Sequence, residues 1–180
     1  MFTVILLFLL VILIVFPVMW HRPAPSAREH RHWRYRQTAE RVRRRLPQLA
    51  SDGVRLIYLR KINPYVFEEL LLLAFEQQGL KVVRNHAYSG DGGLDGQVFI
   101  GGERWLIQAK RYGKTIPPSH ISDFATLLLS ERCGGFFIHT GRTGNLSRLL
   151  LHAYPQMQLV SGQRLLNLLA GDASWLSSIS

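Results

Sequence analysis

Three polar residues beside a pair of glycines, Asp95, Gln108 and Lys110, are of the types that could form a metal-dependent hydrolytic site. Gly101-Gly102 predicts a two-residue β-hairpin turn, so that Asp95 faces Gln108 across the two strands. Because side chains alternate along a strand, Lys110 shares a face with Gln108 and lies diagonally from Asp95. The pattern therefore predicts a carboxylate, an amide oxygen and an ammonium group at one end of a hairpin.

These three groups suit the hydrolysis of a phosphodiester bond. Mg²⁺ keeps several of its waters and binds through few protein oxygens, so Asp95 and Gln108 could hold it, and Mn²⁺ is expected to substitute. Lys110 could orient or deprotonate an attacking water, or stabilise the charge that develops on phosphorus. A polar face of an antiparallel hairpin is more often only solvated, so the spacing alone leaves both interpretations open.

Other chemically capable residues do not form a comparable pattern. The glycine-rich stretch 90–96 lacks the alternating acidic ligands of an EF-hand and the Gly-Lys-Ser/Thr ending of a P-loop. His86, His120 and His139 have no metal-ligand spacing between them. Cys133 is the only cysteine, which excludes an intrachain disulfide and a cysteine-rich zinc site, and the apolar run after it favours a buried thiol.

The elements that must position these groups predict an α/β sandwich around a mixed sheet. Asn63-Pro64 is a good helix start, and the apolar residues that follow it fall on one helical face before Gly79. The predicted elements are a helix over 64–78, strands at 80–84, 94–100 and 103–111, a helix across 121–128, a strand at 136–138, a helix at 145–152, a strand at 157–160 and a helix at 163–169.

Several of these stretches together resemble the Mrr-like type IV restriction endonuclease domain of the PD-(D/E)xK nuclease superfamily. The resemblance runs from about Asn63 to Leu169 and implies a restriction-endonuclease-like core, with a mixed central sheet flanked by helices. The motifs that carry it, in the expected order, are Phe67-Glu68, the glycine-rich stretch 90–96, Gln108-Ala109-Lys110-Arg111-Tyr112, and the stretches 135–141 and 159–162.

The resemblance implies Asp95 and Lys110 as catalytic residues, and Gln108 at the place where many relatives carry Glu or Asp. It also implies that Glu68 is a helix-borne acid beside the metal, so that Asp95, Gln108 and Glu68 are the expected metal ligands. Without the resemblance, Glu68 would be interpreted as a solvated helix residue, like its neighbour Glu69. A neutral amide in the ligand set binds a cation less strongly than a carboxylate would.

Candidate DNA contacts come from basic residues near these motifs. Arg111, Lys114 and Arg142 are expected to contact phosphates, and Arg148 is a further candidate. A scattered basic surface would explain the same residues equally well.

Residues 1–20 contain no charged side chain and predict a single transmembrane helix. At ~1.5 Å rise per residue such a helix spans roughly 30 Å, the thickness of the hydrocarbon core. A cleaved signal peptide is the alternative, but it would need basic residues before a shorter apolar core. Because arginines follow Trp20, the positive-inside rule predicts an N-terminus outside a bacterial inner (plasma) membrane and a cytoplasmic C-terminal domain.

Residues 21–50 are expected to form a basic juxtamembrane linker or helix, before a nuclease domain at 51–180. Residues 21–45 contain nine arginines and two glutamates, a net +7 out of the +10 of the whole chain. Their position favours contact with anionic lipid heads. The alternative is an arm that binds DNA phosphates without sequence preference, with Trp33 and Tyr35 available for stacking.

The sequence thus predicts a membrane-anchored, Mg²⁺-dependent DNA endonuclease, which acts in defence against incoming DNA or in processing DNA at the membrane. The first alternative is a non-cleaving module on the same fold that binds and tethers DNA; the retention of Asp95, Gln108 and Lys110 argues against it. A component of a membrane assembly is a further alternative. The expected partners are DNA, the membrane and, in a homodimer, a second copy of the chain.

Overall fold

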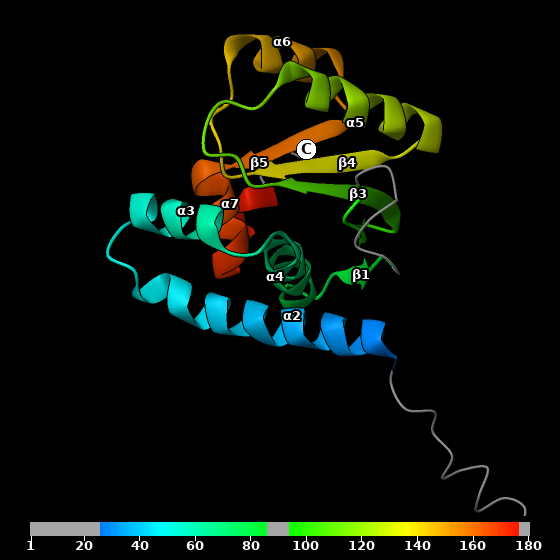
Figure 1. Ribbon diagram of the computed structural model, residues 1–180. Coiled ribbons are helices and arrows are strands. Elements are labelled where there is room, and N and C mark those ends of the chain that lie inside the picture. The colour runs from blue at the N-terminus through cyan, green and yellow to red at the C-terminus, as the bar shows by residue number, and fades with distance from the viewer. Residues whose placement is uncertain (1–25, 86–93, 177–180) are drawn as a thin grey trace, which may run out of the picture. The chain divides into compact units, whose positions relative to one another are not determined.

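The computed structural model describes residues 26–85 and 94–176 (Figure 1). The chain divides into two units, Met1–Trp33 and Arg34–Ser180, and the fold below is that of the second unit. The predicted transmembrane segment at residues 1–20 lies outside the described residues. Within 26–85 and 94–176, no helix is both long and apolar enough to cross a membrane.

A mixed five-stranded sheet forms the centre of the fold, which confirms the predicted α/β core with a mixed central sheet. The first three strands are antiparallel and the last two pairings are parallel, in the spatial order β1-β2-β3-β4-β5. The strands are β1 (Lys81–Val83), β2 (Gly96–Ile100), β3 (Glu103–Lys110), β4 (Gly134–His139) and β5 (Met157–Ser161). Gly101 and Gly102 have φ values of 59° and 89°, as the predicted two-residue hairpin turn requires.

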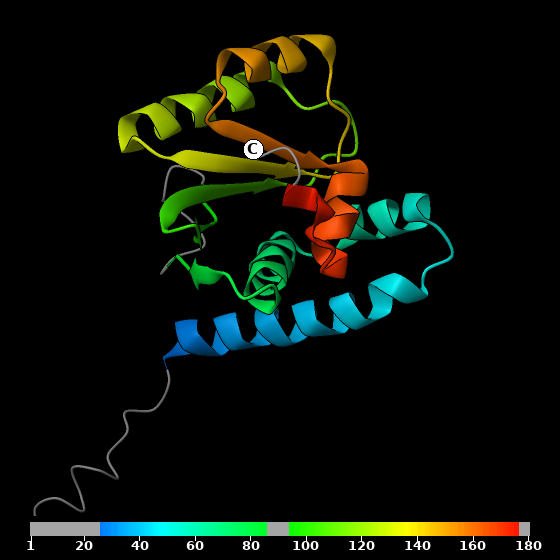
Figure 2. The same cartoon turned by 180° about the vertical axis from the view of Figure 1, so that it is seen from behind.

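Helices cover both faces of the sheet (Figures 1 and 2). α4 (Pro64–Gln77) and α7 (Gly162–Ala170) lie on one face, while α5 (Pro118–Glu131) and α6 (Asn145–Ala153) lie on the other. Alternate residues of β3 supply the two cores: Ile107 packs in the cluster with α4 and α7, whereas Leu106 packs in the cluster with α5. The predicted positions of these helices and strands are confirmed to within a few residues at most ends.

Two helices occupy the segment that the sequence predicts to be a basic linker or helix. They are α2 (Ala27–Arg45) and, after the 3-10 turn η1 (Leu46–Gln48), α3 (Asp52–Lys61). Ala39, Val42 and Leu46 are buried in the same core as α4 and α7. The packed fold therefore begins before position 51.

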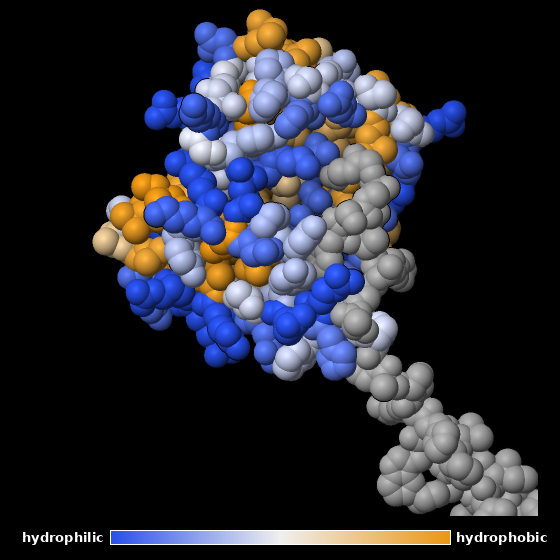
Figure 3. Space-filling model, viewed as in Figure 1, coloured by the Kyte–Doolittle hydropathy of each residue, from blue (hydrophilic) through white to orange (hydrophobic). Residues whose placement is uncertain are grey.

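The sequence does not predict α3, although its start carries a capping signal: the Ser51 side chain accepts a hydrogen bond from the Val54 backbone N–H. Its apolar pattern is weak because only Leu59 is fully buried, while Val54 and Ile57 are exposed. An apolar patch over α3 is visible on the surface in Figure 3. Hydrophobic periodicity cannot reveal a helix whose apolar side chains point both ways.

Substitution of a buried residue on α2 tests whether this helix belongs to the fold. Val42 is 4% exposed, so Val42→Asp should lower the free energy of unfolding by about 3 kcal/mol or more, because it buries an unpaired charge. The neighbouring Arg41 is exposed, so Arg41→Asp is the control and should change stability far less. Denaturant unfolding of the full chain in detergent measures both. Equal, small effects would show that α2 is not packed against the core.

Candidate active site

Asp95 lies one residue before β2 and is bonded to β3 through both its backbone and its side chain. Its backbone N–H donates to the Ile107 carbonyl at 2.8 Å, and its Oδ2 accepts from the Ala109 N–H at 2.6 Å. The carboxylate is therefore held against β3 at the position that lies between Gln108 and Lys110. The pairing of Gly96 with Ile107 gives the hairpin register that the sequence predicts.

The beginning of β2 also lies against α4, because Gly96 has no side chain. A Cβ atom at this position would lie 2.7 Å from Leu72 Cδ2 of α4. The hairpin end that carries Asp95 is thereby brought close to the helix that carries Glu68. This close approach is a packing reason for the glycine that follows Asp95.

Gln108 and Lys110 occupy alternate positions near the end of β3, opposite Phe137 and His139 of β4. Ile107 and Ala109 belong to the cluster that faces α4 and α7, so Gln108 and Lys110 lie on the opposite face of β3. Gln108 is 7% exposed, and Lys110 is half-buried. A polar amide and an ammonium group thus lie at a sheet position that is largely shielded from water.

Glu68 and Glu69 are adjacent on α4, but their side chains lie in different electrostatic environments. Burial and, to a lesser extent, the nearby Asp95 raise the pKa of Glu68 to about 8, although Lys110 and Arg111 oppose the shift. Glu68 is therefore within electrostatic range of both Asp95 and Lys110. Glu69 is buried and accepts a hydrogen bond from Arg84 at 3.0 Å, which gives it a structural ion pair.

The donor set of Glu68, Asp95 and Gln108 fits a hard divalent cation such as Mg²⁺ or Mn²⁺, which prefers carboxylate and carbonyl oxygens. The repulsion between Asp95 and Glu68, which raises the pKa of Glu68, is the interaction that a cation between them would offset. Among residues 26–85 and 94–176, no group of three or more His, Cys, Asp or Glu side chains is arranged to hold a metal ion. Glu68 and Asp95 would therefore be the two anionic ligands of a site here, and the Gln108 amide, on the face of β3 opposite α4, is the third candidate ligand.

The predicted phosphate contacts differ in what their side chains do. Arg111 donates to the backbone carbonyls of Arg60, at 3.1 Å, and Ile62, so its guanidinium caps the C-terminal end of α3. Lys114 and Arg142 are exposed, and their backbones are joined by an N–H···O bond of 3.1 Å. Lys114 and Arg142 therefore form an exposed basic pair, while the half-buried Arg111 side chain is bonded to the end of α3.

His139 and His120, which the sequence leaves as structural or surface residues, lie close to the end of β3. Burial lowers the pKa of His139 to about 4, so this imidazole is neutral near pH 7. Its Nδ1 accepts a hydrogen bond from the Gly141 N–H at 3.1 Å. His120 Nδ1 is bonded to the Tyr112 hydroxyl. His120 is thus bonded to the loop that follows Lys110, and His139 to the loop that follows β4.

Sequence reasoning missed two residues near this site, Arg84 and Asn85, at the end of β1. Arg84 forms the ion pair with Glu69, and Asn85 donates a hydrogen bond to the Leu94 carbonyl. The only signal in the sequence was their position at the end of the predicted strand 80–84. Neither partner could be inferred, because each contact depends on tertiary packing.

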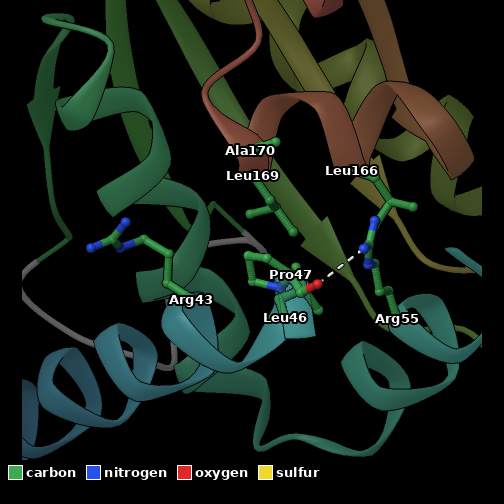
Figure 4. A pocket seen from close by; sticks show the side chains of 7 residues that line it. All are labelled: Arg43, Leu46, Pro47, Arg55, Leu166, Leu169 and Ala170. Carbon is green, nitrogen blue, oxygen red and sulfur yellow. Dashed lines mark hydrogen bonds between the residues drawn. The ribbon is translucent and has the colours of Figure 1, made fainter. Parts of the chain in front are cut away.

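A separate cavity of about 70 Å³ lies between η1, α3 and α7 (Figure 4). Its lining is mainly apolar, and the Arg55 guanidinium beside it donates to the Pro47 carbonyl at 3.1 Å. It contains none of the predicted site residues and is far smaller than the several hundred Å³ typical of ligand pockets. This cavity is therefore separate from the candidate active site at the hairpin end.

The raised pKa of Glu68 predicts a pH-dependent cost in stability. The unfolded chain ionises Glu68 near its ordinary value of 4.5, and the folded chain near 8, so this group makes folding less favourable as pH rises between these values. In metal-free buffer, Glu68→Gln should therefore raise the free energy of unfolding at pH 8 by at least about 1 kcal/mol, and by less at pH 5. Thermal unfolding at the two pH values measures the difference.

Glu69→Gln is the matched control, because it changes the adjacent acid in the same way. It should lower stability at pH 8, since the charged partner of Arg84 is lost. If Glu68→Gln also lowers stability at pH 8, the Glu68 carboxylate is not held near Asp95 in a shielded site.

Comparison with solved structures shows the same fold in a restriction enzyme. The chain is similar to the MspJI restriction endonuclease in complex with a 27-mer oligonucleotide, with 21% identity, a TM-score of 0.50, and coverage of 71% of this chain and 35% of that one. It is also similar to the restriction endonuclease FokI, with 14% identity, a TM-score of 0.48, and coverage of 87% and 32%. This chain matches only about a third of the length of each enzyme. No curated protein is similar enough to count as a match.

Comparison of the sequence with protein families gives a match to a family described as restriction endonuclease, over residues 59–169. The matched range includes Glu68, Asp95, Gln108 and Lys110, and it covers more than half of the chain. The resemblance to Mrr-like nucleases in the sequence is therefore confirmed, and the chain belongs to the restriction endonuclease family.

Proposed function

We propose that this chain hydrolyses phosphodiester bonds of DNA with the help of a divalent metal, Mg²⁺ or Mn²⁺. The observation that carries the proposal is the position of the Asp95 carboxylate, held on β3 between Gln108 and Lys110 and within electrostatic range of Glu68. A non-cleaving DNA-binding module has no use for two carboxylates near a phosphate, because they would repel it. Membership of the restriction endonuclease family supports the same chemistry.

Each residue has a distinct part in this proposal. Asp95 and Glu68 would hold the metal with the amide oxygen of Gln108, and the bound metal would supply positive charge against the scissile phosphate. The Ala109 N–H restrains the Asp95 carboxylate, so that it is positioned before DNA arrives. The Lys110 ammonium, which is half-buried, would orient the attacking water and stabilise the charge that develops on phosphorus. Lys114 and Arg142 would contact DNA phosphates outside the site.

Substitutions along the hairpin test the proposed metal site. Asp95→Asn should abolish plasmid nicking because it removes an anionic metal ligand without changing the size of the side chain, and Lys110→Met should abolish it by removing the positive charge. Gln108→Glu should be tolerated, since it keeps an oxygen at the same reach, whereas Gln108→Leu should be inactive. Nicking against Mg²⁺ concentration, beside circular dichroism of each variant, measures these outcomes.

All four variants should remain folded and keep most of their DNA affinity, because phosphate contacts elsewhere supply that affinity. Cleavage by Asp95→Asn at the unchanged rate would place the metal site elsewhere. If the unchanged protein cuts no form of DNA with Mg²⁺ or Mn²⁺, the non-cleaving DNA-binding alternative replaces the nuclease.

We further propose that the nuclease domain works at the cytoplasmic face of a membrane, with residues 1–20 as a single-pass anchor. The support lies in the outward face of α2. Arg34, Arg41 and Arg44 are exposed on the side of the helix away from the buried Ala39 and Val42, and they form no ion pair with any described residue. The surface along α2 is hydrophilic in Figure 3. A one-sided row of arginines beside a transmembrane segment suits anionic lipid phosphates.

Neutralising part of this row tests the contact with lipid. With the full chain in nanodiscs, α2 should exchange its amide hydrogens more slowly when the lipid is anionic phosphatidylglycerol than when it is phosphatidylcholine. Arg41→Gln/Arg44→Gln should remove much of the difference, since each arginine contributes about 1 kcal/mol near an anionic surface. The control is Arg132→Gln/Arg148→Gln, which neutralises two other exposed arginines. Equal loss in both variants would mean that α2 has no special contact with lipid.

A further inference from the structure

Arg84 connects the end of β1 to the helix that carries Glu68. Its Nε donates to Glu69 Oε2 at 3.0 Å, and its Nη2 donates to Glu76 Oε2 at 2.9 Å. The Glu69 side chain is only 2% exposed, and Glu69 directly follows Glu68 on α4. One guanidinium therefore fixes the helical turn from which Glu68 extends.

Asn85, the next residue, connects the same chain segment to Asp95. Its side-chain Nδ2 donates to the backbone carbonyl of Leu94 at 2.5 Å, and Leu94 directly precedes Asp95. This bond joins the two residues that flank positions 86–93. The neighbouring residues Arg84 and Asn85 thus hold both carboxylates of the candidate site, each through the residue adjacent to it in the chain.

We propose that Arg84 and Asn85 are positioning residues that set the separation of Glu68 and Asp95, and so control metal affinity and turnover without touching metal or DNA. The inference rests on the proposed nuclease function. Two carboxylates that repel each other need such a restraint, because Mg²⁺ demands near-ideal octahedral geometry. The planar guanidinium can bond Glu69 and Glu76 at once, which a lysine ammonium would do with less geometric control.

The alternative is that Arg84 only neutralises the buried Glu69. Removing Arg84 alone would leave that carboxylate buried without its cation, so loss of activity could reflect unfolding. The informative variant is Arg84→Met/Glu69→Met, which removes both partners of the buried pair together, while Glu76 keeps its ion pair with Arg36 at 3.1 Å. Asn85→Asp is the second variant; it is isosteric but replaces the N–H donor with an oxygen that repels the Leu94 carbonyl.

Three measurements on the full chain in detergent distinguish positioning from stability. They are the dissociation constant of Mn²⁺ from electron paramagnetic resonance, kcat and KM for plasmid nicking, and the thermal unfolding midpoint. Both variants should bind Mn²⁺ about tenfold more weakly or worse, and their kcat should fall roughly 10- to 100-fold, as for a small misplacement of catalytic groups. KM for DNA should change little, since neither residue contacts DNA.

The control variant is Arg104→Met/Glu131→Met, which removes an ion pair of the same type, 2.8 Å long, at the other end of β3. It should leave Mn²⁺ affinity and kcat unchanged. If the Arg84/Glu69 double variant fails to fold, the Mn²⁺ affinity and kcat of Asn85→Asp test the inference, because this substitution removes no charge from a buried pair.

The outcomes separate this inference from the proposed function. If the unchanged protein cuts DNA, and both variants bind Mn²⁺ and cut as well as it does, the positioning role is overturned and the nuclease function stands. If kcat falls only together with the unfolding midpoint, while Mn²⁺ affinity is retained, the role of Arg84 is structural and the inference is wrong. If the unchanged protein neither binds Mn²⁺ nor cuts, the proposed function fails and the inference fails with it.

Discussion

The approach of Glu68 to Asp95 is the interaction on which the rest of the site depends. Two carboxylates in a partly buried position repel each other, and the pKa of Glu68 rises to about 8 as a result of burial and of this neighbour. When no cation lies between them, Glu68 is protonated below about pH 8, and free energy from packing must offset the cost of ionising it only above that pH. Regions where a fold accepts such a cost are commonly regions where it carries out chemistry.

The mixed sheet supplies the restraint because its antiparallel and parallel halves meet at β3. The antiparallel partner β2 brings Asp95 to the Ala109 N–H, and the parallel partner β4 places Phe137 and His139 beside Gln108 and Lys110. α4 then approaches closely over Gly96 and presents Glu68. Glu68, Asp95, Gln108 and Lys110 are therefore positioned by elements that pack independently of the site. A shift of any one of these elements would change the distances among the four side chains.

The parts of this arrangement that could be predicted from the sequence are the local ones. Gly101-Gly102 determines the hairpin register, and with it the pairing that places Asp95 beside Gln108, because turn length and strand periodicity are short-range properties. The helix start at Asn63 was predictable for the same reason, and Asn63 does accept a hydrogen bond from the Tyr65 N–H at 2.9 Å. Glu68 was singled out by family resemblance alone, since a helical glutamate has no pattern that distinguishes it from Glu69.

The parts that could not be predicted depend on contacts between residues far apart in the chain. Arg111 was expected to contact DNA, but its guanidinium caps α3, a helix that the sequence did not predict. The arginine-rich segment was expected to be a linker or helix, and its sparse apolar residues, such as Ala39, gave no sign that they pack in the core. Arg84 pairs with Glu69 across 15 positions. Such contacts form only once the chain is folded, and no sequence motif marks them.

The central claim is that Glu68, Asp95 and Gln108 form one metal site. Crystals of the protein soaked in Mn²⁺ and measured at the manganese absorption edge test it most directly, because anomalous scattering locates the ion without reference to activity. The claim predicts an anomalous peak within about 2.5 Å of the carboxylate oxygens of Glu68 and Asp95 and of the Gln108 amide oxygen. A fully occupied Mn²⁺ bound elsewhere in the protein, with none between these three side chains, would contradict it.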